Sequence, residues 1–144
     1  MDVSITDLVE ELKFNTRMQE TEKPYTDEDY LNNVKHGIKL WFIYTQKASV
    51  YDKRAYYIQD EEMFYPYELD ATATEFVLLQ AMLDFYKQVS ASYMGLMNYT
   101  TDALSVQHAD KPYENAKHCM IAIEDKLRTV YFKDVDNTLP LLED

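Results

Sequence analysis

The scarcity of Gly and Pro, which favour tight turns, constrains the fold of this sequence more than any other feature. Its 144 residues include only 2 Gly and 4 Pro. A β-sandwich or β-barrel of this length needs tight turns at short intervals, and those turns favour Gly and Pro. Long helices joined by a few loops need far fewer of them. The sequence therefore predicts a mainly α-helical fold.

The hydrophobic share of 47% is large enough for a core, and the length suits one domain. We expect a small bundle of four to five helices over residues 1–133, followed by a C-terminal docking arm over residues 134–144. The sequence has no secretory leader pattern and no run of about 18 apolar residues, so we expect a cytosolic chain with no membrane partner. Cys119 is the only cysteine, which excludes an intramolecular disulfide and a Cys-based zinc site. Its helical spacing predicts a small buried side chain.

Capping residues mark the start of two helices. Ser4, with Asp7 three residues later, predicts a first helix over residues 6–18. Thr26 is the clearest N-cap of the chain, because carboxylates fill the three positions after it, where the helix dipole favours them. Consecutive helix residues diverge by about 100°, so these carboxylates cannot converge on a metal ion. Capping is therefore the favoured interpretation of the acidic triplet.

Two more helices follow in the second half of the chain. A capping box over residues 72–75 predicts the start of a third helix, whose wide apolar arc marks it as the most buried. Small residues at 90–95 either break or kink this helix, or they allow close packing and let it continue through Leu104. We expect the last helix to have Pro112 in its first turn. Its apolar stripe consists of Ala116, Met120, Ile123, Leu127 and Val130.

Helical periodicity fails between residues 46 and 70, where tyrosines are interspersed with carboxylates. We expect a long loop there, with possible short strands over residues 54–58 and 62–69. Exposed tyrosines suit protein interfaces because they combine a large area with a polar tip. The candidate partner-binding residues are Tyr56, Tyr57, Tyr65 and Tyr67 in this loop and Leu139, Leu141 and Leu142 in the arm.

Charge is distributed unevenly along a chain whose net charge is −12. Residues 30–56 carry five bases and one acid, whereas residues 57–75 carry six acids and no base. Phosphate binding needs a basic stripe, but five bases on an acidic protein more often form a solvated face or contact an acidic neighbour. Nucleic-acid binding is therefore the less favoured interpretation of these bases. They are Lys35, Lys39, Lys47, Lys53 and Arg54.

We expect no enzymatic activity. The sequence has no nucleophile elbow, no Gly-rich phosphate loop and no His-Glu-x-x-His motif. Glu114 and His118 are a His–carboxylate pair at helical spacing, but the further Glu-x-x-His motifs of a di-metal bundle are missing. No catalytic residue, metal ligand or cofactor is predicted.

The N-terminal half combines an apolar helix start over residues 5–12, a polar loop and the run Tyr-Thr-Asp-Glu-Asp-Tyr-Leu over residues 25–31. Asn and apolar positions follow in the second helix, and a Tyr-Pro-Tyr loop over residues 65–67 precedes the next long helix. In these elements the chain resembles the head-to-tail adaptor (connector or head-completion) proteins of tailed bacteriophages.

The resemblance implies a structural virion protein without catalysis, located in the neck after assembly in the host cytoplasm. Such adaptors form a ring beneath the portal protein, extend the DNA channel and provide a docking surface for tail or stopper proteins. An acidic ring would let DNA slide through without specific binding. The basic segment of one copy would then meet the acidic segment of its neighbour and close the ring.

Other classes of protein share some of these features. An acidic DNA mimic, which occupies the cleft of a DNA-binding enzyme, would have the same net charge. It would also need carboxylates arrayed along one exposed face at phosphate-like spacing. Another protein-interaction module, or a small helical enzyme with a site in the Tyr- and acid-rich loop, is a further alternative.

Overall fold

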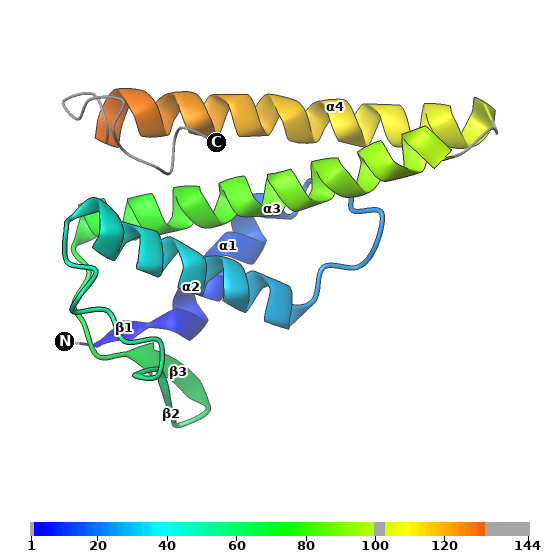
Figure 1. Cartoon of the computed structure of the whole chain (residues 1–144). Helices are drawn as coiled ribbons and strands as arrows, with labels where there is room; N and C mark the ends of the chain where they lie inside the picture. Colours follow the sequence, from blue (N-terminus) through cyan, green and yellow to red (C-terminus); the bar gives the residue numbers. More distant parts are fainter. Residues whose placement is uncertain (1, 100–102, 132–144) are drawn as a thin grey trace.

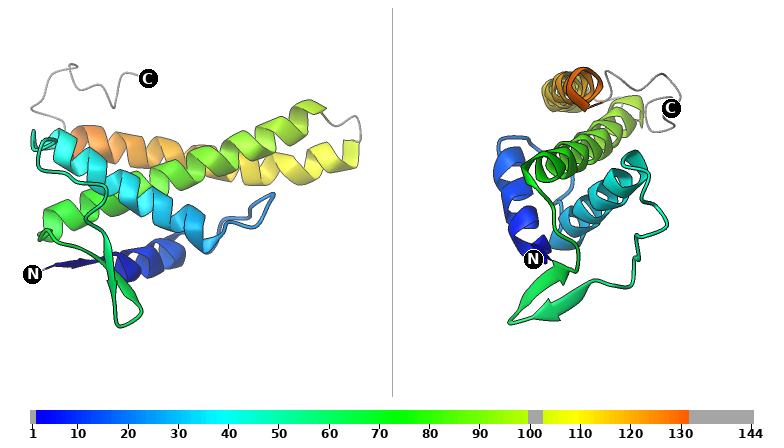
Figure 2. Two further views of the ribbon diagram at one scale, coloured as in Figure 1. Left: turned by 60° about the horizontal axis from the view of Figure 1, so that its bottom comes forward. Right: turned by 90° about the vertical axis from the view of Figure 1, so that its left-hand side faces the viewer.

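The computed structural model describes residues 2–99 and 103–131, and the mainly helical prediction is confirmed. Long helices α3 and α4 lie antiparallel, and Figure 2 shows α3 between α4 on one side and α1 and α2 on the other. A small sheet lies at one end of the molecule (Figure 1). The predicted arm over residues 134–144 lies outside the described residues. The elements are β1 (Val3–Ser4), α1 (Ile5–Thr16), α2 (Asp27–Tyr44), β2 (Tyr57–Gln59), β3 (Glu62–Tyr65), α3 (Ala71–Tyr99), α4 (Ala103–Lys126) and the π-helical turn η1 (Leu127–Tyr131).

Both predicted N-caps of the first two helices are confirmed. The Ser4 hydroxyl accepts a hydrogen bond from the backbone N–H of Asp7 at 3.2 Å, although α1 is two residues shorter at its C-terminal end than predicted. At α2 the Thr26 hydroxyl accepts from the Asp29 N–H at 3.2 Å, and the Asp29 carboxylate accepts from the Thr26 N–H at 2.9 Å. This reciprocal capping box stabilises the start of α2, typically by about 1 kcal/mol.

The predicted start of α3 is wrong by two residues. Asp70 is the N-cap, because its carboxylate accepts from the Ala73 N–H at 2.8 Å and thereby satisfies a free donor of the first turn. The helix then runs unbroken to Tyr99. Ser90 on it is buried, and the Ser92 hydroxyl donates to the Glu22 carboxylate at 2.6 Å. Of the two alternatives for residues 90–95, the continuing helix is therefore the observed one, although it ends before Leu104, which belongs to α4.

The prediction of Pro112 in the first turn of the last helix is wrong, because α4 begins at Ala103 and contains this proline in its interior. An interior proline costs a helix about 3 kcal/mol, since it removes a backbone hydrogen bond and crowds the preceding turn. Packing of α4 along α3 (Figure 1) supplies the compensation. Pro112 is buried, and its carbonyl accepts from the Gln19 side-chain amide at 3.1 Å.

The apolar stripe of α4 is confirmed at Ala116, Ile123 and Leu127 but is wrong at Val130, which is 53% exposed. Tyr131 is buried in its place. The π-helical turn η1 explains the change, because it holds more residues per turn than an α-helix and rotates the next side chains by one position.

The sheet has the strand order β1-β3-β2, and both pairings are antiparallel. The predicted strand over residues 62–69 exists in shortened form as β3, and the one over residues 54–58 is shorter and shifted toward the turn as β2; the prediction has no counterpart of β1. Asp60 and Glu61 form the two-residue turn of the hairpin, with φ angles of 54° and 65°. Such positive angles at both positions define a type I′ turn. The hairpin projects from the helices in Figure 2.

Apolar side chains form two neighbouring clusters on the two sides of α3. One cluster joins α1 and α2 to the first half of α3 and includes Ile38 and Phe42. The other joins α3 to α4 and includes Phe76 and Phe85, with Cys119 partly buried at its edge. The backbones of α2 and α3 are close because residue 37 is Gly: a Cβ there would lie 2.7 Å from the carbonyl oxygen of Val77.

Candidate interaction site

The prediction that Tyr65 is exposed to a partner is wrong, because this side chain is only 3% exposed. Successive side chains of a strand point to opposite faces, and Tyr65 on β3 points toward the helices. Its ring centre lies 4.6 Å from that of Tyr56 and 5.7 Å from that of Tyr51. Its hydroxyl accepts a hydrogen bond from the Asp52 N–H at 2.9 Å, and burial raises its pKa. Tyr65 therefore anchors the 46–56 loop to the core.

The other three predicted tyrosines are partly buried and make contacts within the chain. Burial raises the pKa of Tyr56 strongly, and a hydrogen bond with Tyr51 adds to this shift. Tyr57 stacks on Phe64 at 5.6 Å and donates to the carboxylate of Asp2, which raises its pKa. The ring of Tyr67 packs on Phe42 at 4.5 Å. The three arm residues Leu139, Leu141 and Leu142 lie outside the described residues.

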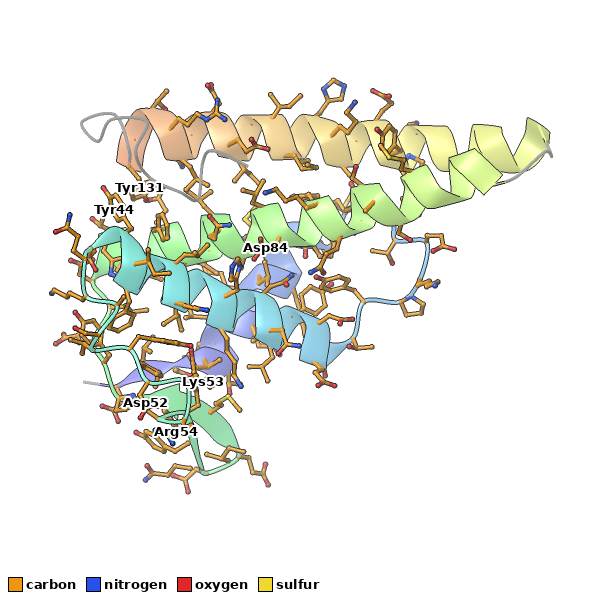
Figure 3. The ribbon with its side chains drawn as sticks, viewed as in Figure 1. Tyr44, Asp52, Lys53, Arg54, Asp84 and Tyr131 are labelled. Carbon is orange, nitrogen blue, oxygen red and sulfur yellow. The ribbon has the colours of Figure 1, made fainter. Side chains whose placement is uncertain are left out.

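An open groove of about 570 Å³ lies between α2 and the loop that precedes β2. We call it the basic groove. Lys35 and Lys39 are four residues apart and therefore share one face of α2. The loop residues Asp52, Lys53 and Arg54, labelled in Figure 3, form the opposite wall. The lining residues are Lys35, His36, Lys39, Tyr51, Asp52, Lys53 and Arg54.

Several groups of the basic groove are already paired. The Asp52 carboxylate accepts from the Arg54 N–H at 2.9 Å, and this hydrogen bond is the main cause of the lowered pKa of Asp52. The His36 Nδ1 lies 2.5 Å from a carboxylate oxygen of Asp84 on α3. The Lys35 ammonium lies 4.8 Å from the centre of the Tyr56 ring, within cation–π range. These contacts fix the walls of the groove.

Lys39 and Lys53 provide positive charge that no described residue neutralises. Neither forms a salt bridge within 4.0 Å in the part of the chain that the structure describes. Both are exposed at the groove. The groove is therefore a surface with a surplus of cations on a protein that is acidic as a whole.

The acidic segment divides into paired and unpaired carboxylates. Asp70 caps α3, and Glu75 forms a salt bridge with Lys126 at 3.0 Å, which lowers its pKa. Three successive acids at the end of the β-hairpin are exposed and form no salt bridge with any described residue. We call them the acidic tip: Asp60, Glu61 and Glu62.

The acidic tip does not lie in the basic groove of its own chain. Glu61 borders a different depression of about 280 Å³, together with Ile58 of β2 and residues of α1 and the first half of α2. Ile58 is 71% exposed at the side of the tip. One chain therefore displays two separate surfaces of opposite charge.

The sequence located the two charged segments but not the residues that remain unpaired within them.

Comparison with models of protein families, with curated proteins and with solved structures finds no match to this chain. None of the described helices is long and apolar enough to cross a bilayer. Within residues 2–99 and 103–131, no group of three His, Cys, Asp or Glu side chains is placed to hold a metal ion.

Proposed function

We propose that this protein is a structural virion protein: a head-to-tail adaptor that forms a ring beneath the portal of a tailed bacteriophage. The observation that carries this proposal is a pair of separate surfaces of opposite charge on one helical scaffold, each with charged groups that no described residue pairs. Repeated self-association needs two different surfaces that fit each other. A protein that acts as a ring subunit has this requirement, whereas a monomeric enzyme does not.

The order of the N-terminal elements supports the same proposal. Helix α1, a polar loop and the capped start of α2 follow one another as the resemblance to adaptors implies. The loop with Pro66 leads directly into the long helix α3, as that resemblance also implies.

The net charge of −12 suits a subunit whose ring surrounds DNA. A negative wall repels the phosphate backbone and lets the duplex pass without being held. In this proposal the ring extends the DNA channel of the portal protein and presents a docking surface to tail or stopper proteins. No catalytic step and no cofactor is part of it.

The paired carboxylates favour an adaptor over a DNA mimic. A mimic needs many free carboxylates in rows that match the spacing of phosphates. In this chain Asp29 and Asp70 cap helices, and Asp27 and Glu75 pair with lysines at 2.7 and 3.0 Å. The acids that remain free at the hairpin form a compact tip and not a row.

Electron microscopy of the full chain mixed with the portal protein encoded by the same genome tests the proposal. We expect a second ring of density on the narrow end of the portal. A portal that stays bare at every concentration of the chain would contradict the adaptor function. Strong binding to a basic DNA-processing enzyme instead would favour the mimic.

The C-terminal segment offers a second test, which is argued from the sequence alone. Three leucines on a short segment that contains Pro140 suit an arm that docks on the portal or on a neighbouring subunit. Deleting residues 135–144 should abolish assembly and leave the helical circular dichroism unchanged. The matched control replaces Glu143 and Asp144 by Gln and Asn, which keeps the leucines. A ring that forms equally well after the deletion would refute the arm.

A further inference from the structure

We propose that the basic groove of one copy binds the acidic tip of the next copy, and that this contact closes the ring. The ring itself rests on the proposed function. The contact itself rests on the charges and positions of the described residues. It assigns a specific site and a specific occupant to self-association.

The groove has room and charge for such an occupant. It is an open space of about 570 Å³, which provides room for a narrow hairpin end. Lys39 and Lys53 lie on its two sides and have no carboxylate partner among the described residues. Two carboxylates of the acidic tip placed between them would neutralise two charges that otherwise repel each other.

The acidic tip has the shape that the groove requires. A two-residue turn is the tightest connection between antiparallel strands, and the two strands beside it lie only about 5 Å apart. Both turn residues and Glu62 are exposed, and the hairpin projects from the helical body (Figure 2). The exposed Ile58 next to the tip adds apolar area that such a contact would bury.

Placement of the two surfaces makes the contact run from head to tail. The tip borders α1 and the first half of α2, whereas the groove lies between α2 and the 51–54 loop. The acidic tip and the basic groove are therefore different surfaces of the same chain. A contact of this kind is repeated from copy to copy, and it ends in a closed ring if the rotation per copy divides a full turn.

An acidic protein tip suits the groove better than a nucleic acid does. Only two cations of the groove, Lys39 and Lys53, have no partner among the described residues, which is too few for the basic stripe that a nucleic-acid backbone needs. A short tip of three carboxylates matches this small number of free cations.

Charge-reversed variants test the contact in a sedimentation series of the chain alone. K39E/K53E reverses the groove, and E61K/E62K reverses the tip. Each should weaken self-association about tenfold or more, because it places like charges opposite each other. The control K23E/K87E makes the same change in net charge as K39E/K53E, at two exposed lysines that do not line the groove, and should associate as the wild type does.

Mixing the two reversed variants is the decisive step. The reversed groove of K39E/K53E is negative and should bind the positive tip of E61K/E62K. The groove of E61K/E62K is unchanged and should bind the unchanged tip of K39E/K53E. An equimolar mixture should therefore assemble with alternating chains. Circular dichroism shows whether each variant is folded. Association of the wild type should also fall as salt rises from about 0.1 M to about 1 M, because the screening length falls from about 10 Å to about 3 Å.

Several outcomes would overturn the inference. One is a groove-reversed variant that associates like the wild type, and another is a mixture that fails to assemble although both chains are folded. A third is tight binding of a labelled DNA duplex by the wild type that K39E/K53E abolishes. If the groove-reversed chain still forms a ring on the portal, only this contact is wrong. If the wild type ignores the portal, the adaptor function fails independently of the contact.

Discussion

At the scale of single residues, the turn of the β-hairpin has an unusual composition. A type I′ turn favours Asn-Gly, because both positions need positive φ. Here Asp60 and Glu61 occupy them at 54° and 65°. Asp tolerates this conformation, but for Glu it costs roughly 1–2 kcal/mol, since its Cβ crowds the following carbonyl. The carboxylates are thus present in spite of the turn, which fits a role in contact with a partner.

Replacing Glu61 by Gly should raise the free energy of unfolding of the monomer by about 0.5–1 kcal/mol, because Gly adopts positive φ without strain but loses more entropy on folding. Chemical denaturation measures the change. Glu62→Gly is the matched control: it removes the same charge from β3, where φ is negative, and should lower stability. If Glu61→Gly also lowers the free energy of unfolding, the backbone at Glu61 is not strained.

At the scale of elements, the α4–η1 junction determines which C-terminal side chains reach the core. The aromatic ring of Tyr131 packs edge-on against Phe76 at 5.5 Å, and Tyr44 donates a hydrogen bond to its backbone carbonyl. Both tyrosines lie close together at the end of the bundle in Figure 3. The π-helical turn thereby attaches the end of α4 to α2 and α3.

Two alanine variants at adjacent positions test this register. Tyr131→Ala should lower the free energy of unfolding by about 3 kcal/mol, because it empties a buried aromatic site. Val130→Ala should change it by no more than about 0.5 kcal/mol, since the side chain is exposed. Denaturant titration of both variants measures the difference. The opposite order would mean that Val130, and not Tyr131, packs in the core.

The elements also differ in how far sequence could predict them. The starts of α1 and α2 were predicted because a cap is a local signal: Ser4 and Thr26 bond to residues three positions away. The interior position of Pro112 was not predictable, because it depends on packing against α3. Strand β1 was missed because it has two residues and pairs with a strand about sixty positions later.

At the scale of the whole molecule, buried tyrosines couple folding to alkaline pH. Burial raises the pKa of Tyr25 and of Tyr131 to about 12, from an ordinary value of about 10. Above pH 10 the unfolded chain releases these protons and the folded chain keeps them. These two phenols therefore make their full contribution to the free energy of unfolding below about pH 10, and this contribution is lost as pH rises toward about 12.

Unfolding free energy measured between about pH 9 and about pH 12 should fall steeply on the alkaline side. The phenolate absorbance of the folded protein should show a fraction of tyrosines that ionise late. Tyr25→Phe removes one of these groups and should flatten the decline. A stability that stays constant through this range would show that the buried phenols ionise as freely as they do in the unfolded chain.

How much of the candidate site could be predicted from the sequence also depends on the arrangement of the whole molecule. Counting charges located a basic segment and an acidic segment, but it could not separate Glu75, which pairs with Lys126, from the free acids of the hairpin. Nor could it show that Tyr65 is core while Lys39 and Lys53 face an open groove. Pairing and burial depend on which elements meet, and that information is not local.

The mass of the particle formed with the portal protein of the same genome tests the central claim most directly. The chain is titrated into preformed portal rings, and mass is recorded over a concentration series. We expect one step in mass, equal to a fixed whole number of subunits, that saturates and is lost with the groove-reversed chain. A portal mass that does not change at any concentration would contradict the adaptor function.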